Sequence, residues 1–229
     1  MTIVSIRQPG YLAYTGFFKR IESCDVFVYL DDVLYERGRW DNRNFIKSSE
    51  GTVLLTIPAY NKSGQNFSEV KIVNSENWSK KHRTSIKLNY QKAPYFEKYW
   101  PHIEAILSEK WEKLIDLNIA LIEFFNLELG LKTKTIKSSD LKMNSSGSEK
   151  LLEICKHLDA KTYLSGASGH NYLDEKIFQD EGIEVIYENF ISEKYNQIHG
   201  KFIPNLAFID LLFNEGENSK NVLLNSKNT

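Results

Sequence analysis

Hydrophobic positions near the start of the chain form two short strand-like runs with a helical pattern between them. "TIVSI" begins at Thr2 and "DVFVYLDD" begins at Asp25, and both runs are rich in β-branched and aromatic residues, as buried strands are. Residues 16–23 carry apolar side chains at helical spacing. A strand, a helix and a second strand in this order form a βαβ unit, so we expect the two strands to be parallel.

The rest of the chain alternates between the same two patterns. Strands are predicted at residues 52–59, 69–73, 133–141, 162–166 and 183–190. Helices are predicted from about 74–78 onward, at 101–129, from Ser148 to near Leu158, and at 204–216. This alternation predicts an α/β fold, namely a three-layer, mostly parallel sheet of the nucleotidyltransferase or Rossmann-like kind with added helices. The length suits one domain over residues 1–229, and we expect residues 217–229 to fray.

Composition narrows the classes of partner. The formal net charge is -1, which gives no global basic field, so we expect no nucleic-acid partner. The two cysteines, Cys24 and Cys155, stand far apart inside apolar patterns and exclude a disulfide framework or a cysteine-rich zinc site. No apolar run approaches the roughly 20 residues of a membrane span, and the first residues do not resemble a signal peptide. We therefore expect a cytoplasmic protein without a membrane span.

The loop after the first strand carries the first candidate binding residues. Ligands of open α/β sheets bind beyond the carboxyl ends of the strands, where loops lead into helices. Arg7 and Lys19 can bind phosphate or carboxylate, and Gln8 can donate and accept hydrogen bonds. Gly16 would let an anion approach the helix N-terminus, and Tyr11 can pack against a ligand ring. A plain strand-ending turn at Pro9 accounts for the same residues equally well.

A second group follows the strand that ends in Asp31 and Asp32. The next residues contain an unusual density of hydrogen-bond donors: Arg37, Arg39, Trp40, Asn42, Arg43, Asn44 and Lys47. Adjacent strand residues point to opposite faces, so only one of the two aspartates would face a site. Two adjacent acids can bind a metal, but no further carboxylate stands at a diagnostic spacing, and we expect no metal site.

The third candidate is the loop "YLSGASGHNYLD". Ser165, Gly166 and Gly169 follow a strand and can form a backbone anion site, although such loops are most often plain turns. The loop lacks both the Walker and the dinucleotide-binding patterns. Of the five histidines, His82 in a basic helical stretch and His170 in this loop are the candidates for proton transfer.

Taken together, these segments resemble the WbqC-like family along nearly the whole chain. The resemblance rests on "QPGYLAYTGFFKRI", "DVFVYLDDVLYERGRWDNRNFIKSSEG", "APYFEKYW", "TYLSGASGHNYLDEKIFQDEGIEVIYENF" and "HGKFIPNLAFIDLLFNEG". It implies a bacterial protein of surface-polysaccharide synthesis, such as that of O-antigen (lipopolysaccharide). The implied reaction attaches an amino-acid-derived acyl group, for example glycyl, to the amine of a nucleotide-linked amino sugar.

This chain departs from the family pattern at two positions. Family members usually read His-Gln-Pro and Tyr-Leu-Pro-Trp, where this chain has Arg7-Gln8-Pro9 and Tyr11-Leu12-Ala13-Tyr14. The replacement of the histidine by Arg7 bears on any mechanism that needs that imidazole. The order of strand, loop, helix and strand is also similar to the start of pantoate-β-alanine ligase, which makes an amide through an acyl-adenylate, but the likeness is one of fold alone.

Amide formation needs an activated acyl donor, a neutral amine and stabilisation of an oxyanion. Under this hypothesis Asp31, Asp32 or His170 deprotonates the amine, and Gln8 assists. The binding residues are Arg7, Lys19, Arg43, Lys47, Asn42, Asn44 and His82 for polar groups, Ser165, Gly166 and Gly169 for an oxyanion, Gly16 for close approach, and Tyr11, Trp40 and Tyr172 for rings. The cofactor is left open between ATP with magnesium and a thioester-bound acyl donor on an acyl carrier protein. A non-catalytic binding or carrier protein and a nucleotidyltransferase are the alternatives, and the oligomeric state is open.

Overall fold

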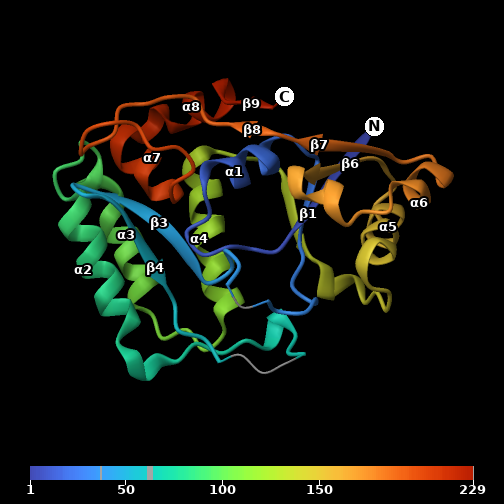
Figure 1. Cartoon of the computed structure of the whole chain (residues 1–229), viewed down its shortest axis with the longest axis horizontal. Coiled ribbons are helices and arrows are strands. Elements are labelled where there is room, and N and C mark those ends of the chain that lie inside the picture. Colours follow the sequence, from blue (N-terminus) through green and yellow to red (C-terminus); the bar gives the residue numbers. More distant parts are fainter. Residues whose placement is uncertain (37, 61–63, 229) are drawn as a thin grey trace.

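A computed structural model of the chain describes residues 1–36, 38–60 and 64–228. Its centre is a sheet of five strands: β1 (Thr2–Arg7), β2 (Val26–Tyr29), β5 (Lys134–Lys137), β6 (Ala160–Gly166) and β7 (Glu184–Glu188). The strand order is β5-β2-β1-β6-β7, and each neighbouring pair is parallel. The predicted α/β class with a mostly parallel sheet is therefore confirmed (Figure 1).

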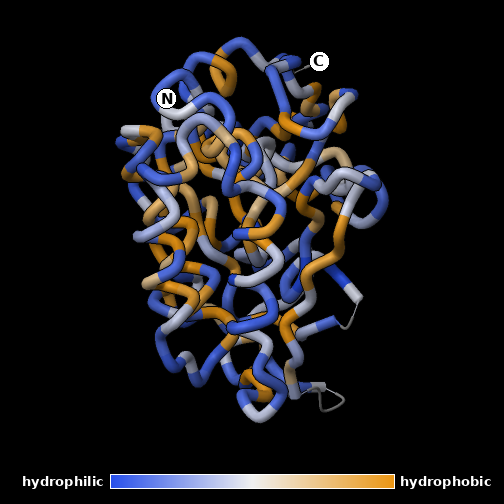
Figure 2. Tube along the Cα trace, turned by 90° about the vertical axis from the view of Figure 1, so that its left-hand side faces the viewer, coloured by the Kyte–Doolittle hydropathy of each residue, from blue (hydrophilic) through white to orange (hydrophobic). Residues whose placement is uncertain are grey.

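Helices cover both faces of this sheet. The alternation along β1 sends Val4 and Ile6 into one apolar cluster with α5 (Gly147–His157) and α6 (Glu175–Asp180). The opposite face packs against α1 (Thr15–Glu22), whose Phe17 and Phe18 belong to the larger apolar cluster. Hydrophobic positions recur along the interior elements and polar ones along the outer turns (Figure 2).

The larger cluster joins the sheet to a helical region and a hairpin. The helices are α2 (Trp78–Tyr90), α3 (Phe96–Ser108), α4 (Leu114–Leu129), α7 (Phe208–Glu215) and α8 (Ser219–Asn225). The hairpin is β3 (Arg43–Ser48) with β4 (Gly51–Thr56), and a second short pair is β8 (Phe190–Ile191) with β9 (Lys227–Asn228). Short 3₁₀ turns lie at Phe67–Glu69 (η1), Asn74–Glu76 (η2), Ser138–Leu141 (η3), Ala167–Asn171 (η4) and Gly216–Asn218 (η5).

Several elements differ from the sequence prediction, among them β3, for which no strand is predicted, and β4, which ends at Thr56 and not at residue 59. Residues 69–73 form no strand, because Glu69 ends η1 and only Lys71 and Ile72 pair, each in one isolated bridge. The helix predicted at 101–129 is two helices, α3 and α4, since the polar residues between them adopt extended backbone, as at Glu109. The strand predicted at 133–141 ends at Lys137 and continues as η3. The end predicted to fray from Glu217 forms η5 and α8, whose Val222 and Leu223 are buried.

Within the described ranges, every helix is too short or too polar to cross a bilayer.

Candidate functional site

The carboxyl end of β1 is the point at which the chain changes direction across the sheet. Strand β2 follows β1 in the sequence and pairs on one side of it, whereas the later strand β6 pairs on the other side. In open α/β sheets ligands bind beyond the strands at such a reversal. The loop from Arg7 to Gly10 and the end of β6 at Gly166 therefore lie where a ligand is expected.

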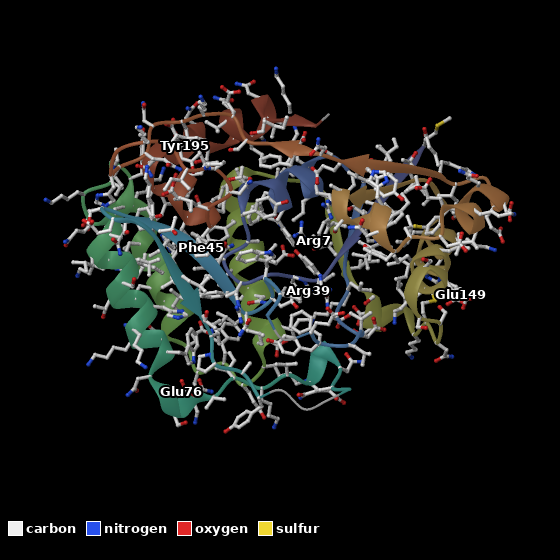
Figure 3. All side chains as sticks on the ribbon, in the orientation of Figure 1. Arg7, Arg39, Phe45, Glu76, Glu149 and Tyr195 are labelled. Carbon is white, nitrogen blue, oxygen red and sulfur yellow. The ribbon has the colours of Figure 1, made fainter. Side chains whose placement is uncertain are left out.

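Arg7 is the last residue of β1 and is half-buried. Its guanidinium carbon lies 5.4 Å from the ring centre of Tyr14 and 5.5 Å from that of Phe17. Both rings belong to the start of α1, so cation–π contacts hold the charge beside the helix N-terminus. Figure 3 shows Arg7 near the centre of the view, and the charges of Arg7 and Arg39 both act on Asp41.

Asn118 of α4 ties the loop after β1 to the loop before β3. Its Nδ2 donates to the carbonyl of Pro9 (2.9 Å) and to the carbonyl of Asp41 (2.7 Å). The two loops approach so closely that a Cβ at Gly10 would lie 3.2 Å from the carbonyl oxygen of Trp40. Segments more than 30 residues apart in the sequence are thereby fixed side by side.

Asp41 is the residue with the most unusual surroundings in this region. Its side chain is buried, and its Oδ2 has no hydrogen-bond partner among the described residues. Burial raises the pKa of the Asp41 carboxyl to about 6, although the charges of Arg7 and Arg39 oppose this rise. A carboxylate with such a pKa accepts a proton near neutral pH.

Other unmet hydrogen-bonding groups lie close to Asp41. In the described part of the chain, Asn42 Oδ1, Arg43 Nε and Asn118 Oδ1 are buried and lack a partner. Buried polar atoms are nearly always hydrogen-bonded in folded proteins, so a concentration of exceptions indicates unfilled binding capacity. We call Arg7, Asp41, Asn42 and Asn118 the Asp41 site.

Arg20 and Glu188 form a second polar pair at the same end of the sheet. Arg20 Nε donates to Glu188 Oε2 (2.8 Å), and the two side chains are 7% and 1% exposed. A Cβ on Gly166 would lie 2.4 Å from Arg20 Nη2, so only glycine permits this close approach. The guanidinium therefore lies against the last residue of β6, on the side of α1.

The sequence prediction missed Asp41, Asn118, Arg20 and Glu188. One signal was available for Arg20, a charged residue three positions after Phe17 on the apolar side of the predicted helix. Another was available for Asp41, which stands among the donors of "RWDNRN". Nothing in the sequence near Asn118 indicates that its amide bridges two loops.

The aspartates predicted to be catalytic serve the structure of the sheet edge. Asp31 Oδ1 accepts from the Ser139 amide (2.9 Å) and the Ser138 hydroxyl (3.0 Å), and its Oδ2 accepts from the Ser139 hydroxyl (2.7 Å). Asp32 pairs with Lys150 of α5 (2.7 Å) and also accepts from Ser138. Both carboxylates are thus occupied in joining the end of β2 to η3 and α5.

Tyr11 and His82 form a pair inside the core. The Tyr11 hydroxyl lies 2.9 Å from His82 Nδ1, and both side chains are buried. Burial lowers the pKa of His82 to about 4, so its ring is neutral at physiological pH. This arrangement gives neither residue access to a ligand in the described structure.

The predicted Gly-Ser loop is only partly open. A Cβ on Gly169 would lie 2.3 Å from the hydroxyl of Ser165, which is itself buried. His170 is exposed and stacks on Tyr187, with ring centres 3.5 Å apart. Tyr172 is 61% exposed. His170 and Tyr172 are accessible side chains, whereas Ser165 and Gly169 pack against their neighbours.

Gly16 and Lys19 do not form an open anion site at the start of α1. A Cβ on Gly16 would lie 2.5 Å from the Tyr14 ring and 2.7 Å from the Phe190 ring, so aromatic side chains occupy this space. Lys19 pairs with Glu22 (3.1 Å) and donates to the carbonyl of Leu224 in α8 (3.3 Å). Both residues therefore have packing or tethering roles.

Of the predicted donors that follow Asp32, some lie at the Asp41 site and others hold the fold together. Asn42 Nδ2 donates to the Ile57 carbonyl (2.8 Å), which leaves Oδ1 unmet. Asn44 Nδ2 donates to the carbonyl of Leu12 (2.7 Å), and Lys47 is fully buried within β3. Trp40 is 52% exposed and packs on Phe45, with ring centres 5.8 Å apart. Arg37 lies outside the described residues.

The described residues contain no group of three histidine, cysteine, aspartate or glutamate side chains that could hold a metal ion. Gln8 is half-buried and stands between Arg7 and Pro9, whose carbonyl accepts from Asn118. The structure therefore brings the loop that follows Arg7 and Gln8 against the loop that precedes Asn42 and Arg43, and places Gly166 at the end of the adjacent strand. The side chains of Asp31, Asp32, His82, Lys19 and Lys47 are instead bonded to other parts of the fold, although Leu30, the residue before Asp31, donates to the Arg7 carbonyl.

The sheet and the Asp41 site define an α/β protein with a polar site at the carboxyl end of its first strand. The model of the WbqC-like protein family matches residues 8–222, and the chain belongs to this family. It is also similar to the uncharacterized protein Rv1507c of Mycobacterium tuberculosis (strain ATCC 25618 / H37Rv), with 31% identity over 227 residues. That similarity covers 97% of this chain and 98% of the mycobacterial protein.

Proposed function

We propose that this protein forms an amide on the amine of a nucleotide-linked amino sugar in the synthesis of a surface polysaccharide, with Asp41 as the proton acceptor. The observation that carries the proposal is the Asp41 carboxylate, which is buried, has an unpartnered Oδ2 and has a pKa of about 6. A base of this strength is mostly deprotonated at pH 7 and can still hold the proton of an attacking amine. Family membership supports the setting, and the choice of acyl group rests on the resemblance alone.

The proposed step uses the residues as follows. The amine nitrogen forms a bond to the acyl carbon, and Asp41 accepts the proton that the nitrogen loses. The bond from the acyl carbon to its activating group breaks, and that group leaves with the electron pair. Arg7 supplies a fixed positive charge for a phosphate or carboxylate of the substrate, and Asn118 keeps its loop beside Asp41.

The first experiment is a thermal-shift panel of the purified protein with amino-sugar nucleotides, their unmodified parents, ATP and coenzyme A thioesters. A ligand that binds only the folded state raises the melting temperature. Selective stabilisation by an amino-sugar nucleotide identifies the acceptor. Stabilisation by ATP alone supports activation through an adenylate, and affinity without any acylated product supports a binding or carrier protein.

The Asp41→Asn variant then tests the base. We expect kcat/KM for the identified acceptor to fall at least about 100-fold, since general-base catalysis contributes about that much. In the wild type kcat/KM should rise with pH through about 6, where Asp41 loses its proton, and the variant should lose this rise. Asp180→Asn, an exposed aspartate of α6, is the matched control. Wild-type turnover by Asp41→Asn would remove Asp41 from the mechanism.

A further inference from the structure

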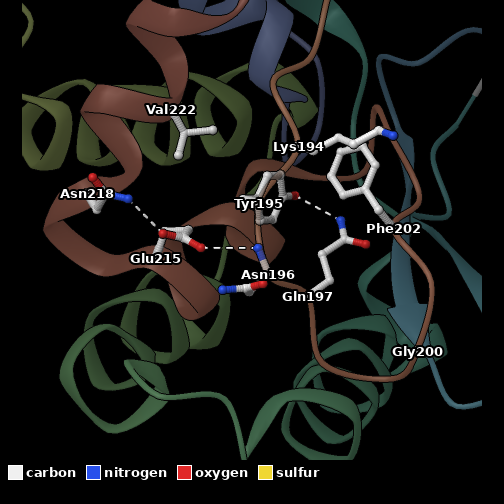
Figure 4. Close-up of a pocket in the computed structure, with 9 residues that line it drawn as sticks. All are labelled: Lys194, Tyr195, Asn196, Gln197, Gly200, Phe202, Glu215, Asn218 and Val222. Atoms are coloured by element: carbon white, nitrogen blue, oxygen red, sulfur yellow. Dashed lines mark hydrogen bonds between the residues drawn. The ribbon is translucent and has the colours of Figure 1, made fainter.

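A pocket of about 480 Å³ lies between the segment after β8 and the turn from α7 into α8. Tyr195, Asn196 and Phe202 line it from the segment, and Glu215 and Asn218 line it from the helical turn (Figure 4). These residues fall in the last part of the chain, which the Asp41 site does not use. The lining side chains combine aromatic rings, amides, the Glu215 carboxylate and the Lys194 ammonium group.

Hydrogen bonds on the protein side of the pocket hold the Tyr195 ring in place. Its hydroxyl donates to Asp210 Oδ1 (2.7 Å) and accepts from Gln197 Nε2 (3.0 Å). Asp210 is fully buried and accepts a second bond at Oδ2 from the Tyr90 hydroxyl (2.7 Å). With both of its hydrogen bonds made on the buried side, the Tyr195 hydroxyl holds the ring in one orientation.

Lys47 anchors the segment after β8, which carries Tyr195 and Phe202, the aromatic wall of the pocket. It is fully buried, and its Nζ donates to Gln197 Oε1 (2.8 Å) and to the carbonyl of Lys201 (2.6 Å). Farther along, His199 Nε2 lies 2.7 Å from the carbonyl of Asn89. Because the loop is anchored at several points before any ligand arrives, binding costs little ordering entropy.

The polar groups of the pocket include Asn196, Glu215 and Asn218. Glu215 Oε1 accepts from the Asn196 amide (3.2 Å), and Oε2 accepts from Asn218 Nδ2 (2.7 Å). Each carboxylate oxygen keeps a lone pair for another donor. Phe202 meets Tyr195 edge to face, with ring centres 5.2 Å apart. The pocket thus offers a ring surface beside a carboxylate that can accept hydroxyl groups.

We infer that this pocket binds an uncharged saccharide. The apolar face of a sugar ring suits the fixed aromatic wall, and its neighbouring hydroxyls suit the Glu215 carboxylate and the two asparagine amides. Glu215 and Lys194 give the lining one charge of each sign, so no net charge favours an anion such as phosphate, and the polar lining disfavours a purely apolar ligand. The site is separate from the Asp41 site, because Arg43 and Lys47 alone are roughly 13 Å apart along β3. The inference therefore does not depend on acyl transfer.

Saturation-transfer NMR on the whole protein tests the saccharide pocket. N-acetylglucosamine and glucose are the observed ligands, and inorganic phosphate is the competitor. We expect saturation transfer to at least one sugar and no displacement of that sugar by phosphate. Glu215→Gln and Phe202→Leu should each weaken the sugar affinity about tenfold, as the loss of one charge-assisted hydrogen bond or one ring contact would. Glu76→Gln, an exposed glutamate on η2 far from Tyr195 in Figure 3, should leave it unchanged.

Two results would overturn the inference. One is the absence of transfer to either sugar, and the other is equal sugar binding by the wild type and both pocket variants in folded form. Displacement of the sugar by phosphate would also overturn it and assign the pocket to anions. Asp41→Asn distinguishes this test from that of the proposed function, since it should keep sugar binding here even where it abolishes turnover.

Discussion

Asp31 and Asp41 are both buried and stand ten residues apart, but they differ in the number of hydrogen bonds that their carboxylate oxygens accept from the rest of the protein. Asp31 accepts three bonds from Ser138 and Ser139, so both of its oxygens are occupied. Asp41 is as deeply buried, yet its Oδ2 accepts none from the described residues, and its pKa is raised to about 6. A satisfied carboxylate holds the structure together, whereas one with unmet capacity is available to a ligand or a proton.

The largest expected effect is the loss of stability in Asp31→Ala. This change removes the charged acceptor of the Ser139 amide and hydroxyl, while the buried Ser138 hydroxyl keeps only Asp32, which should lower the free energy of unfolding by about 4 kcal/mol. Urea denaturation at pH 7 measures it, with Asp180→Ala as the exposed control. A loss below about 1 kcal/mol would mean that Asp31 is not a structural residue.

His82 extends the comparison to a second group that the sequence suggested for proton transfer. Its pKa is about 4 in the folded protein and about 6.5 when unfolded, so the unfolded chain binds more protons between these values. The contribution of neutral His82 to the free energy of unfolding is fully present above about pH 6.5, and it falls by about 3 kcal/mol as the pH drops to 4. His82→Asn should remove that part of the acid sensitivity, measured as the difference from the wild type in denaturation between pH 4 and 7. An unchanged difference across this range contradicts a buried neutral His82.

The fold could be predicted from the sequence because its signals are local. The runs "TIVSI" and "DVFVYLDD" around an apolar helix are enough to indicate parallel strands, and β1, α1 and β2 lie where the pattern places them. Errors fall where a partner decides the structure. Residues 69–73 have a strand pattern without a strand to pair with, and residues 219–225 become a helix because α1 offers them a surface.

The site could be predicted only in part, for a related reason. Arg7 and Gln8 follow directly from the end of a predicted strand. The position of Asp41 depends on Asn118, which bonds to the carbonyls of both Asp41 and Pro9 and so holds their two loops together. These three residues are far apart in the sequence, so no local pattern predicts their contact. Conversely, the sequence suggests that Asp31 is an active carboxylate, because it does not show that Ser138 and Ser139 of η3 bond to it in the fold.

The Asp41→Asn variant should be more stable than the wild type, opposite in sign to Asp31→Ala. Because the folded pKa of about 6 lies above the usual 3.8, the folded state binds more protons than the unfolded state between these values. Burial of the charged form therefore costs stability above pH 6, and the neutral amide should recover about 2 kcal/mol at pH 8. The gain should vanish at pH 4, where Asp41 is protonated. A loss of stability at pH 8 would show that the Asp41 charge is compensated in the folded protein.

The smallest expected effect concerns Arg7, whose positive charge opposes the rise in the pKa of Asp41 that burial causes. Arg7 lowers the pKa of Asp41 more than the exposed Arg39 does, because its guanidinium is held half-buried against Tyr14 and Phe17. Arg7→Gln should raise the pKa of Asp41 by up to about one unit, or about 1 kcal/mol, and Arg39→Gln by less. Carbon-13 NMR titration of the Asp41 carboxyl measures both shifts, and Arg83→Gln on α2 should produce none. If Arg39→Gln gives the larger shift, the cation that accompanies Asp41 comes from the exposed loop, and Arg7 is free to bind a substrate anion without affecting the base.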